Sequence, residues 1–301
     1  MLKKCIPAVL AFLLVLSACG PAAPATPNKD DTFTVVATTY PVYLFATEVT
    51  KGVPGLSVTL LVNQPVSCLH DYTLSVHDMK VLEGADLIVR SGAGLEDSMA
   101  STLNTVKNTP QIDCAQAVSL LTLTESAGQT AEPDPHIWLD PIRAGQMIET
   151  LAQGLAQEDP DHAQTYLDNA KHARDTLTQR YETMKASLAD LSCRELITFH
   201  DGFQYFAQAF DLTILRSIEE EAGSEASAQE VGQIVADIKT KQLPAIFTEK
   251  NGATATAELI RRETGVPVFQ LDLMMSGEGT DLSAYLTLLQ TNVDTIREAY
   301  A

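Results

Sequence analysis

Basic residues are scarce in this chain. Only 20 of its 301 residues are Lys or Arg, whereas 39 are Asp or Glu, and the formal net charge is −19. A nucleic-acid-binding protein needs a basic face, so this composition argues against that class of function. A negative field is compatible with a cationic ligand, although acidity also keeps an exported protein soluble.

Long apolar runs are almost absent too. The longest run near the start extends from Ile6 to Leu16 and follows Lys3 and Lys4. It is too short to span a bilayer as a helix, so residues 1–18 are predicted to form a cleaved signal peptide. The string Leu16-Ser17-Ala18-Cys19-Gly20 is typical of a bacterial lipobox and predicts lipidation of Cys19. An ordinary signal peptide with a chance cysteine is the alternative.

The next segment cannot build a hydrophobic core. Residues 19–32 are rich in Pro, Ala, Thr and Asp, which predicts a lipidated, flexible tether. Such a tether would hold the remaining residues at the extracytoplasmic face of the cell membrane. No later segment is long and apolar enough to cross a bilayer.

Cysteine is also rare. Beyond Cys19 the sequence has only Cys68, Cys114 and Cys193. Export permits a disulfide, and we favour Cys68 with Cys114 because both are expected at loop ends of the first half. Cys68 is two residues from His70, which raises a metal-ligand role as an alternative to a disulfide.

What the chain does contain is an alternation of strand and helix patterns. The strands are apolar on both faces, which predicts an α/β fold with parallel sheets covered by helices. Two helices are expected to begin at Ser75 and Ser227, each with an acidic residue three positions on. The expected strands are 33–39, 56–62, 87–89, 195–199, 213–216, 245–248 and 266–271.

One long helix separates the two halves. Small and apolar residues recur every three or four positions from Tyr166 to Leu191, after an Asp159-Pro160 start. A face held for about thirty residues predicts a rod of roughly 45 Å. We therefore predict an N-terminal lobe over 33–157, a rigid linking helix over 158–191 and a related C-terminal lobe over 192–301. A surface helix within one large domain is the alternative.

Three of the six histidines lie in polar loops and are widely separated in the sequence. They are His70, His136 and His200, and Asp272 follows the last expected strand. These ligands can meet only if the fold gathers loops from both halves. Ligands in parallel sheets bind at the carboxyl ends of strands, where His200 and Asp272 are expected. Three imidazoles and one carboxylate form a tetrahedral zinc set.

Each of these histidines has a carboxylate close by in the sequence. Asp71 follows His70, Asp201 follows His200, and Asp134 and Asp140 flank His136. A ligating imidazole normally donates its second N–H to a carboxylate or carbonyl. His77, His162 and His172 lie on expected helices and are assigned no metal role.

Several strings of this sequence resemble the zinc- and manganese-specific solute-binding lipoproteins of bacterial ABC transporters. The resemblance covers essentially the whole predicted body. It implies two α/β lobes joined by one rigid helix, a metal buried between them and ligands at His70, His136, His200 and Asp272. The strings are Cys68-Leu69-His70-Asp71-Tyr72, Gly92-Ala93-Gly94-Leu95-Glu96, Asp134-Pro135-His136-Ile137-Trp138, Phe199-His200-Asp201-Gly202-Phe203 and Leu271-Asp272.

The chain departs from the family pattern near Asp272, where Leu273 and Met274 replace a more usual proline. Glu249 is the alternative oxygen ligand. Manganese members usually have Glu where this chain has His200, so the set favours Zn²⁺ over Mn²⁺. The resemblance implies a monomeric capture protein without catalysis, whose partners are an ABC permease and its ATPase. A secreted zinc hydrolase is a remote alternative, since no His-Glu-x-x-His motif is present.

Overall fold

We analysed a computed structural model of the chain. It describes residues 32–64, 69, 72–106, 108–122, 132–219, 226–250 and 254–300. Residues 32–301 form one compact unit. The predicted signal peptide and Cys19 lie outside the described residues. Within the described ranges, no helix is long and apolar enough to cross a membrane.

The first lobe is built around a four-stranded parallel sheet with strand order β2-β1-β3-β4. Val35, Val36 and Ala37 on its central strand are fully buried, as expected for a parallel strand covered on both faces. The elements of this lobe are β1 (Phe33–Ala37), α1 (Tyr40–Val49), β2 (Leu56–Leu60), α2 (Val76–Glu83), β3 (Leu87–Arg90), η1 (Asp97–Met99), α3 (Ala100–Leu103), η2 (Asn104–Val106), β4 (Gln111–Asp113), η3 (Ile137–Leu139) and α4 (Pro141–Glu158).

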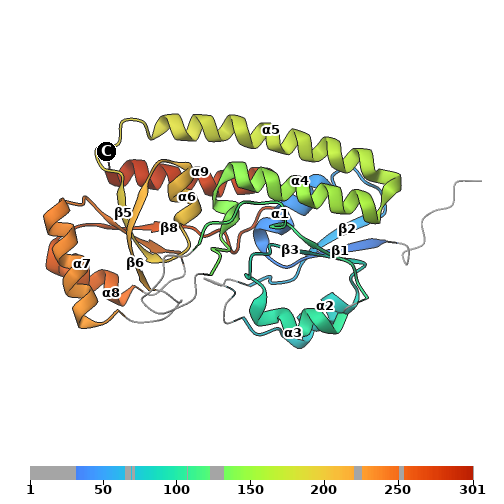
Figure 1. Cartoon of the computed structure of the whole chain (residues 1–301), viewed down its shortest axis with the longest axis horizontal. Coiled ribbons are helices and arrows are strands. Elements are labelled where there is room, and N and C mark those ends of the chain that lie inside the picture. The colour runs from blue at the N-terminus through green and yellow to red at the C-terminus, as the bar shows by residue number, and fades with distance from the viewer. Residues whose placement is uncertain are drawn as a thin grey trace, which may run out of the picture. The chain divides into compact units, whose positions relative to one another are not determined.

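The second lobe repeats that arrangement. Its sheet has the order β6-β5-β7-β8 and is again parallel, so both lobes place their second strand outside their first. The predicted pair of related α/β lobes is therefore confirmed (Figure 1). The elements from the linking region onward are η4 (Pro160–His162), α5 (Ala163–Ser187), β5 (Glu195–His200), α6 (Gln204–Ala209), β6 (Thr213–Glu219), α7 (Ala228–Lys241), β7 (Ile246–Glu249), α8 (Ala255–Thr264), β8 (Val268–Leu271) and α9 (Leu282–Tyr300).

Both predicted helix caps are present. Ser75 accepts a hydrogen bond from the Asp78 N–H, and the Asp78 carboxylate accepts one from the Ser75 N–H. Ser227 and Glu230 form the same reciprocal pair at the start of α7. Each box satisfies two backbone donors that a helix start leaves without intrahelical partners.

The long helix α5 is shorter than the sequence predicts. A 3-10 turn over Pro160–His162 precedes it, and it ends at Ser187 rather than near residue 191. The Asp159 carboxylate does not cap the backbone, because the His162 ring and the Tyr166 hydroxyl contact it instead. The predicted apolar face is nevertheless buried, at Tyr166, Ala170, Ala173, Leu177 and Met184.

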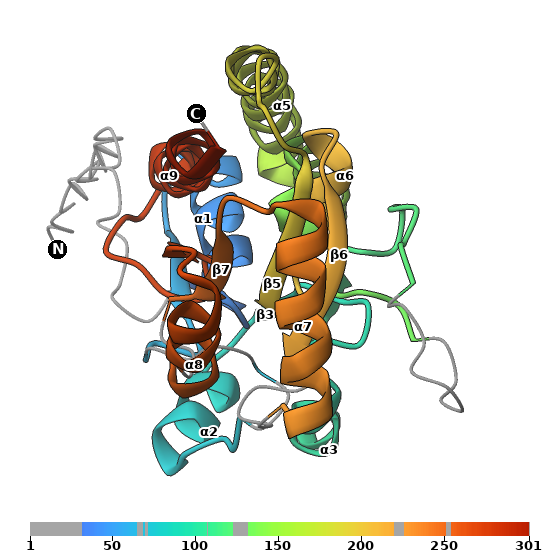
Figure 2. The same cartoon turned by 90° about the vertical axis from the view of Figure 1, so that its left-hand side faces the viewer.

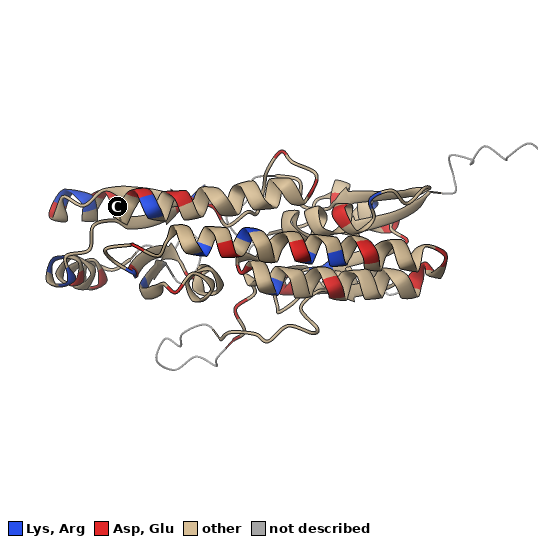
Figure 3. Cartoon of the chain, turned by 90° about the horizontal axis from the view of Figure 1, so that it is seen from above, with Lys and Arg blue, Asp and Glu red and all other residues tan. Residues whose placement is uncertain are grey.

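Packing around α5 joins the lobes. The helix contacts α1, α4 and α9, and the Tyr181 hydroxyl donates to the Ala209 carbonyl of the second lobe at 2.8 Å. Figure 3 shows acidic and basic residues interspersed along the long helices, with exposed pairs such as Lys171–Asp175. Exposed pairs contribute only about 0–1 kcal/mol each, so the buried face holds this layer together.

The C-terminal helix also ties the two sheets together. It contacts β8 of the second lobe and α1 of the first, and Figure 2 shows α9 beside α1. One hydrophobic cluster runs through both lobes, and a smaller one lies beneath α7 and α8. The boundaries predicted at residues 157 and 192 stay predictions, and α9 contacts elements on both sides of them.

Two local features differ from the sequence analysis. Strand β4, of only three residues, was not predicted because Gln111–Asp113 is too short to show a period. Cys114 is a free thiol with no exposed surface, which departs from the predicted disulfide with Cys68. Burial raises the pKa of this thiol. An expected position at a loop end does not constrain the distance between two cysteines, which a disulfide requires. Cys68 itself lies outside the described residues.

Candidate functional site

His136 lies in the loop that leads into α4. The Asp140 side chain begins that helix by accepting hydrogen bonds from the Ile142 and Arg143 N–H groups, and Pro141 occupies the first helical position. Proline there lacks only an N–H that would have no partner in the helix. The Asp140 cap and Pro141 therefore fix where the loop ends and α4 begins. His136 itself is 2% exposed.

The Asp134 carboxylate sets the orientation of this imidazole. Its Oδ1 accepts from the His136 N–H at 2.9 Å and lies 2.8 Å from Nδ1 of the ring. A carboxylate can only accept, so Nδ1 carries the proton and donates. The neutral ring then presents Nε2 with its lone pair, as a metal ligand must. Asp134 is fully buried.

His200 ends β5 and meets His136 across the lobes. The two Nε2 atoms are 3.3 Å apart, the ring centroids are 5.1 Å apart, and His200 is 3% exposed. The His200 Nδ1 atom is buried without a hydrogen-bond partner in the part of the chain that the structure describes. Two of the three predicted histidine ligands are thus brought together from opposite lobes.

Gly202 makes this close approach sterically possible. A Cβ atom at this position would lie 2.7 Å from His200 Cδ2, 3.0 Å from Leu273 Cδ2 and 3.1 Å from His136 Nε2. The contact with His200 is shorter than a real Cβ atom makes, and the other two would require their neighbours to shift by a few tenths of an ångström. These contacts also show that the loop after β8 borders both imidazoles.

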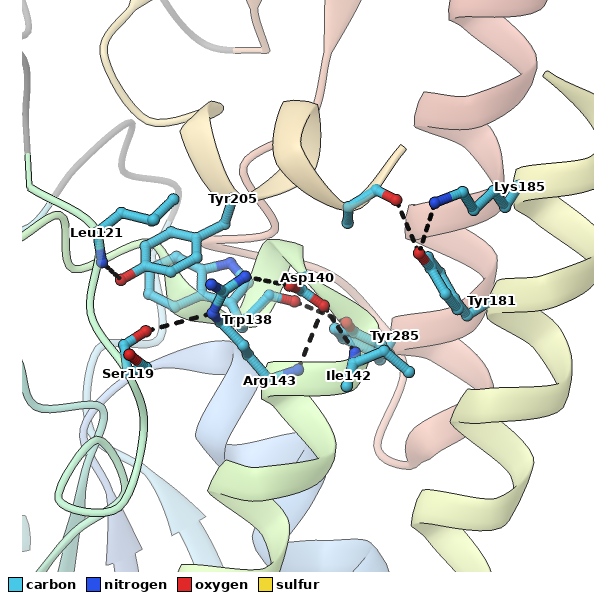
Figure 4. A network of polar contacts seen from close by, with 11 residues as sticks. Ser119, Leu121, Trp138, Asp140, Ile142, Arg143, Tyr181, Lys185, Tyr205 and Tyr285 are labelled. Carbon is cyan, nitrogen blue, oxygen red and sulfur yellow. Dashed lines mark hydrogen bonds and ion pairs between the residues drawn. The ribbon is translucent and has the colours of Figure 1, made fainter. Parts of the chain in front are cut away.

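The loop carrying His136 is anchored from the second lobe. The Trp138 indole N–H donates to the Leu273 carbonyl at 2.9 Å, and the Tyr285 hydroxyl donates to the Trp138 carbonyl at 2.6 Å. Both rings are fully buried. Figure 4 shows Trp138 and Tyr285 near the start of α4. Neutral hydrogen bonds of this kind contribute about 1 kcal/mol each, and more is lost when a buried partner is left unpaired.

A second anchor lies at the outer edge of the site. The Leu121 N–H donates to the Tyr205 hydroxyl at 2.8 Å, and the Arg143 guanidinium lies 5.1 Å from the Tyr205 ring centroid. Arg143 also forms an ion pair with Asp140 (Figure 4). Burial raises the pKa of Tyr205 to about 12, so its hydroxyl stays neutral at physiological pH.

The two predicted oxygen ligands lie on neighbouring strands. Glu249 ends β7 and is 3% exposed, and its register partner Leu271 precedes Asp272. The Asp272 Oδ2 atom is 3.1 Å from the Lys250 ammonium, and Oδ1 accepts from the Met274 N–H at 2.7 Å. Both carboxylate oxygens of Asp272 therefore have partners other than a metal.

The described residues hold only part of the predicted ligand set. No three His, Cys, Asp or Glu side chains among them lie close enough together to hold a metal ion. His70, Asp71 and Cys68 lie outside the described residues. Asp201 accepts from Gln204 and Ser217, and none of its recorded contacts is with His200. Of the histidines that were assigned no metal role, His77 and His172 are exposed and His162 is partly buried.

Sequence reasoning missed several residues that shape the site. Gly202, Lys250, Leu273 and Tyr285 were given no role, although each contacts a predicted ligand or its loop. Asp134 was only one of two candidates flanking His136. Only the His-Asp-Gly string hinted at Gly202, since glycine beside a ligand often marks a close approach.

Comparison with known proteins identifies the relatives of this arrangement. The sequence profile of the family described as zinc-uptake complex component A, periplasmic, matches residues 35–299. The chain belongs to this family. It is accordingly a metal-binding, extracytoplasmic component of a transporter, and its relatives are solute-binding proteins.

Members and neighbours of the zinc-uptake component family differ in the metal they are named for. The iron-binding protein YfeA of Yersinia pestis is 25% identical over 97% of this chain and 94% of its own length. The manganese-binding lipoprotein MntA of Halalkalibacterium halodurans is 23% identical, over 95% of each. A crystal structure of ZnuA is 28% identical, with a TM-score of 0.78, over 90% of this chain and all of that chain. These comparisons support a divalent metal without fixing which one.

Proposed function

We propose that this protein captures Zn²⁺ between its lobes and delivers it to an ABC permease and its ATPase. The ligands are His70, His136, His200 and the carboxylate of Asp272, with Glu249 as the alternative oxygen ligand. Mn²⁺ is the second candidate cargo, because the family includes a manganese-named relative. Lipidation of Cys19 would hold the protein, as a monomer, at the outer face of the cell membrane.

The observation that carries this proposal is the distance between the two imidazoles. Two nitrogens bound to one tetrahedral zinc at 2.0–2.1 Å lie roughly 3.3–3.4 Å apart. The Nε2 atoms of His136 and His200 are 3.3 Å apart, within that range. Burial of both rings and the Asp134 contact to His136 add the supporting features of a metal ligand.

The chain next to His70 is also fixed. Leu69 is fully buried, and the Ser98 hydroxyl donates to its carbonyl at 2.9 Å. An anchored neighbour supports a third imidazole as a ligand. With three nitrogen donors and one oxygen donor, the set matches zinc better than the harder manganese.

The test is metal content and competitive titration of the purified protein with Zn²⁺ and Mn²⁺. The parent is expected to bind one zinc per chain more tightly than manganese. His200→Ala should lose most of this affinity, because it removes a ligand. His172→Ala is the matched control, since it removes an exposed imidazole on α5.

Three results would contradict the proposal. A parent that binds no metal would leave the buried histidines without this role. If His172→Ala and His200→Ala weakened zinc binding equally, His200 could not be assigned as a zinc ligand. Tighter binding of Mn²⁺ than of Zn²⁺ would make manganese, not zinc, the cargo.

A further inference from the structure

Lys250 and Asp272 are neighbours because of the sheet. Strands β7 and β8 pair in parallel, with Glu249 opposite Leu271. The Lys250 N–H donates to the Leu271 carbonyl at 2.9 Å, which extends the ladder by one residue. The two side chains therefore leave the same sheet edge together, and the Lys250 ammonium reaches Asp272 Oδ2 at 3.1 Å.

The backbone of Asp272 is held much more firmly than its side chain. Its N–H donates to the Asn292 side-chain oxygen at 2.8 Å, and its carbonyl accepts from the Asn292 side-chain N–H at 2.8 Å. Asn292 is fully buried on α9. The carboxylate, which holds Lys250 at Oδ2 and the Met274 N–H at Oδ1, can therefore exchange its Lys250 contact without moving this backbone.

The residue after Asp272 reaches the neighbourhood of the two histidines. Leu273 borders the space beside Gly202 that both imidazoles border. Its carbonyl accepts from Trp138 in the loop that carries His136. An approach of the Asp272 carboxylate to a metal would therefore compete with the Lys250 contact at Oδ2, and with the Met274 N–H at Oδ1.

The Lys250 side chain has room for its ammonium group away from Asp272. Its side chain is 53% exposed, whereas that of Asp272 is 14% exposed. It lines a hollow of about 300 Å³ between the two lobes, whose wall includes Asn63 and Gln64 of the first lobe and Glu278 of the second. A displaced ammonium can therefore stay hydrated and near another carboxylate, which keeps its displacement inexpensive.

We propose that Lys250 is a competitor cation for the Asp272 carboxylate and thereby sets how tightly the protein holds its metal. This inference rests on the proposed function. Without metal, the ammonium pairs with the carboxylate, and an incoming Zn²⁺ must displace it. When the metal leaves, Lys250 takes the carboxylate back, so each release step is assisted by a charge already in the chain.

The test is a double-mutant cycle on zinc affinity and on the rate of zinc transfer to a chelator. Lys250→Met keeps the side-chain length but removes the charge. Since a partly exposed ion pair is a weak competitor, we expect about two- to fivefold tighter zinc binding and correspondingly slower release. In an Asp272→Asn background, the same change should have almost no effect.

Lys241→Met is the matched control. Lys241 is a half-exposed lysine that pairs with Glu195 at 2.6 Å, so its loss changes the net charge by the same amount. It is expected to leave zinc affinity unchanged. A tightening common to Lys241→Met and Lys250→Met would reduce the effect to overall charge and overturn the proposal.

Two further outcomes would overturn it while leaving zinc capture intact. Lys250→Met could leave affinity unchanged, or it could tighten binding equally with Asp272 and with Asn at that position. Either result would show that Lys250 does not act through Asp272, although a parent that binds zinc and a His200→Ala variant that does not would still support capture. Failure of the parent to bind zinc would instead remove the proposed function itself.

Discussion

The two lobes share a sheet order and a capped helix, yet they hold their buried histidines differently. His136 of the first lobe is fixed by the Asp134 carboxylate on its ring, and Trp138 beside it is tied to the second lobe. His200 of the second lobe has no hydrogen-bond partner at Nδ1 among the described residues. The first lobe thus holds its imidazole in a preset orientation, and the second presents groups that can still change partners.

The same contrast extends to the carboxylates. Asp272 of the second lobe is engaged by a half-exposed lysine, whereas Asp134 of the first is fully buried beside its histidine. A site with one rigid side and one adjustable side can select a cation and still release it. The difference between two copies of one topology therefore lies in side-chain support rather than in the arrangement of strands.

The largest effect on this comparison is expected from Asp134→Asn. The substitution removes the charge that orients the His136 ring and leaves a buried amide N–H₂ where Asp134 Oδ2 has no partner within the described residues. Loss of such a supporting carboxylate typically weakens metal affinity about 10- to 100-fold. Competitive zinc titration measures it.

Asp201→Asn is the control from the second lobe, because Asp201 contacts Gln204 and Ser217. Its effect on zinc affinity should be under about threefold, since a positioning effect requires contact with the ligand. Equal losses in both variants would show that the two lobes do not differ in this way.

A smaller loss is expected from Gly202→Ala. The added methyl group would lie within 3.1 Å of both imidazoles and push them apart. Overpacking of this kind costs about 1–3 kcal/mol. We expect about 1.4 kcal/mol of that cost to fall on the two imidazoles, which corresponds to roughly tenfold weaker zinc binding.

Gly232→Ala serves as its control, because a Cβ there meets nothing within 4 Å and the residue is inside α7. That change should leave zinc affinity unaltered and raise stability by about 0.5–1 kcal/mol. Unchanged zinc binding by Gly202→Ala would show that the two rings are not held as closely as the structure has them.

The smallest effect concerns the matched capping boxes. Burial would raise the pKa of Asp78, but hydrogen bonds from Ser75 and Tyr72 outweigh burial and hold the pKa below its usual range. The stabilisation is therefore fully present above the ordinary Asp pKa and is lost as pH falls through the lowered value. Asp78→Asn should cost about 1 kcal/mol at pH 7, by urea unfolding of the metal-free protein.

The pH dependence sharpens this prediction. The difference between Asp78→Asn and its parent should shrink as pH falls below about 4, because the parent then loses its charge as well. Glu230→Gln, in the exposed box of the second lobe, should cost less at every pH. A constant difference down to pH 2 would mean that the Asp78 charge does not stabilise the helix.

Much of the fold could be predicted from the sequence. Apolar strand segments, the serine caps with their acidic partners and the periodic face of α5 are local patterns, and local patterns record the burial that they need. The three-residue β4 and the end of α5 were missed because short elements and helix ends depend on their neighbours.

Local sequence patterns predicted only part of the candidate site. Loop position and residue type singled out His70, His136 and His200 from the six histidines. The two of these that the structure describes, His136 and His200, are buried where the other described histidines are not. Nothing local indicated that Asp134 rather than Asp140 would hold the His136 ring. The sequence also could not show that Lys250 would pair with the Asp272 carboxylate, because that contact requires β7 and β8 to pair.

The sequence by itself determined the α/β class, the paired halves and the residue types available to a metal. The tertiary structure decided which of these meet. Parallel pairing sets the carboxyl ends of distant strands at one edge, and the packing of α5 and α9 across both lobes brings two such edges together. A distance of 3.3 Å between nitrogens 64 residues apart is a property of that packing, because no local preference of the chain can encode it.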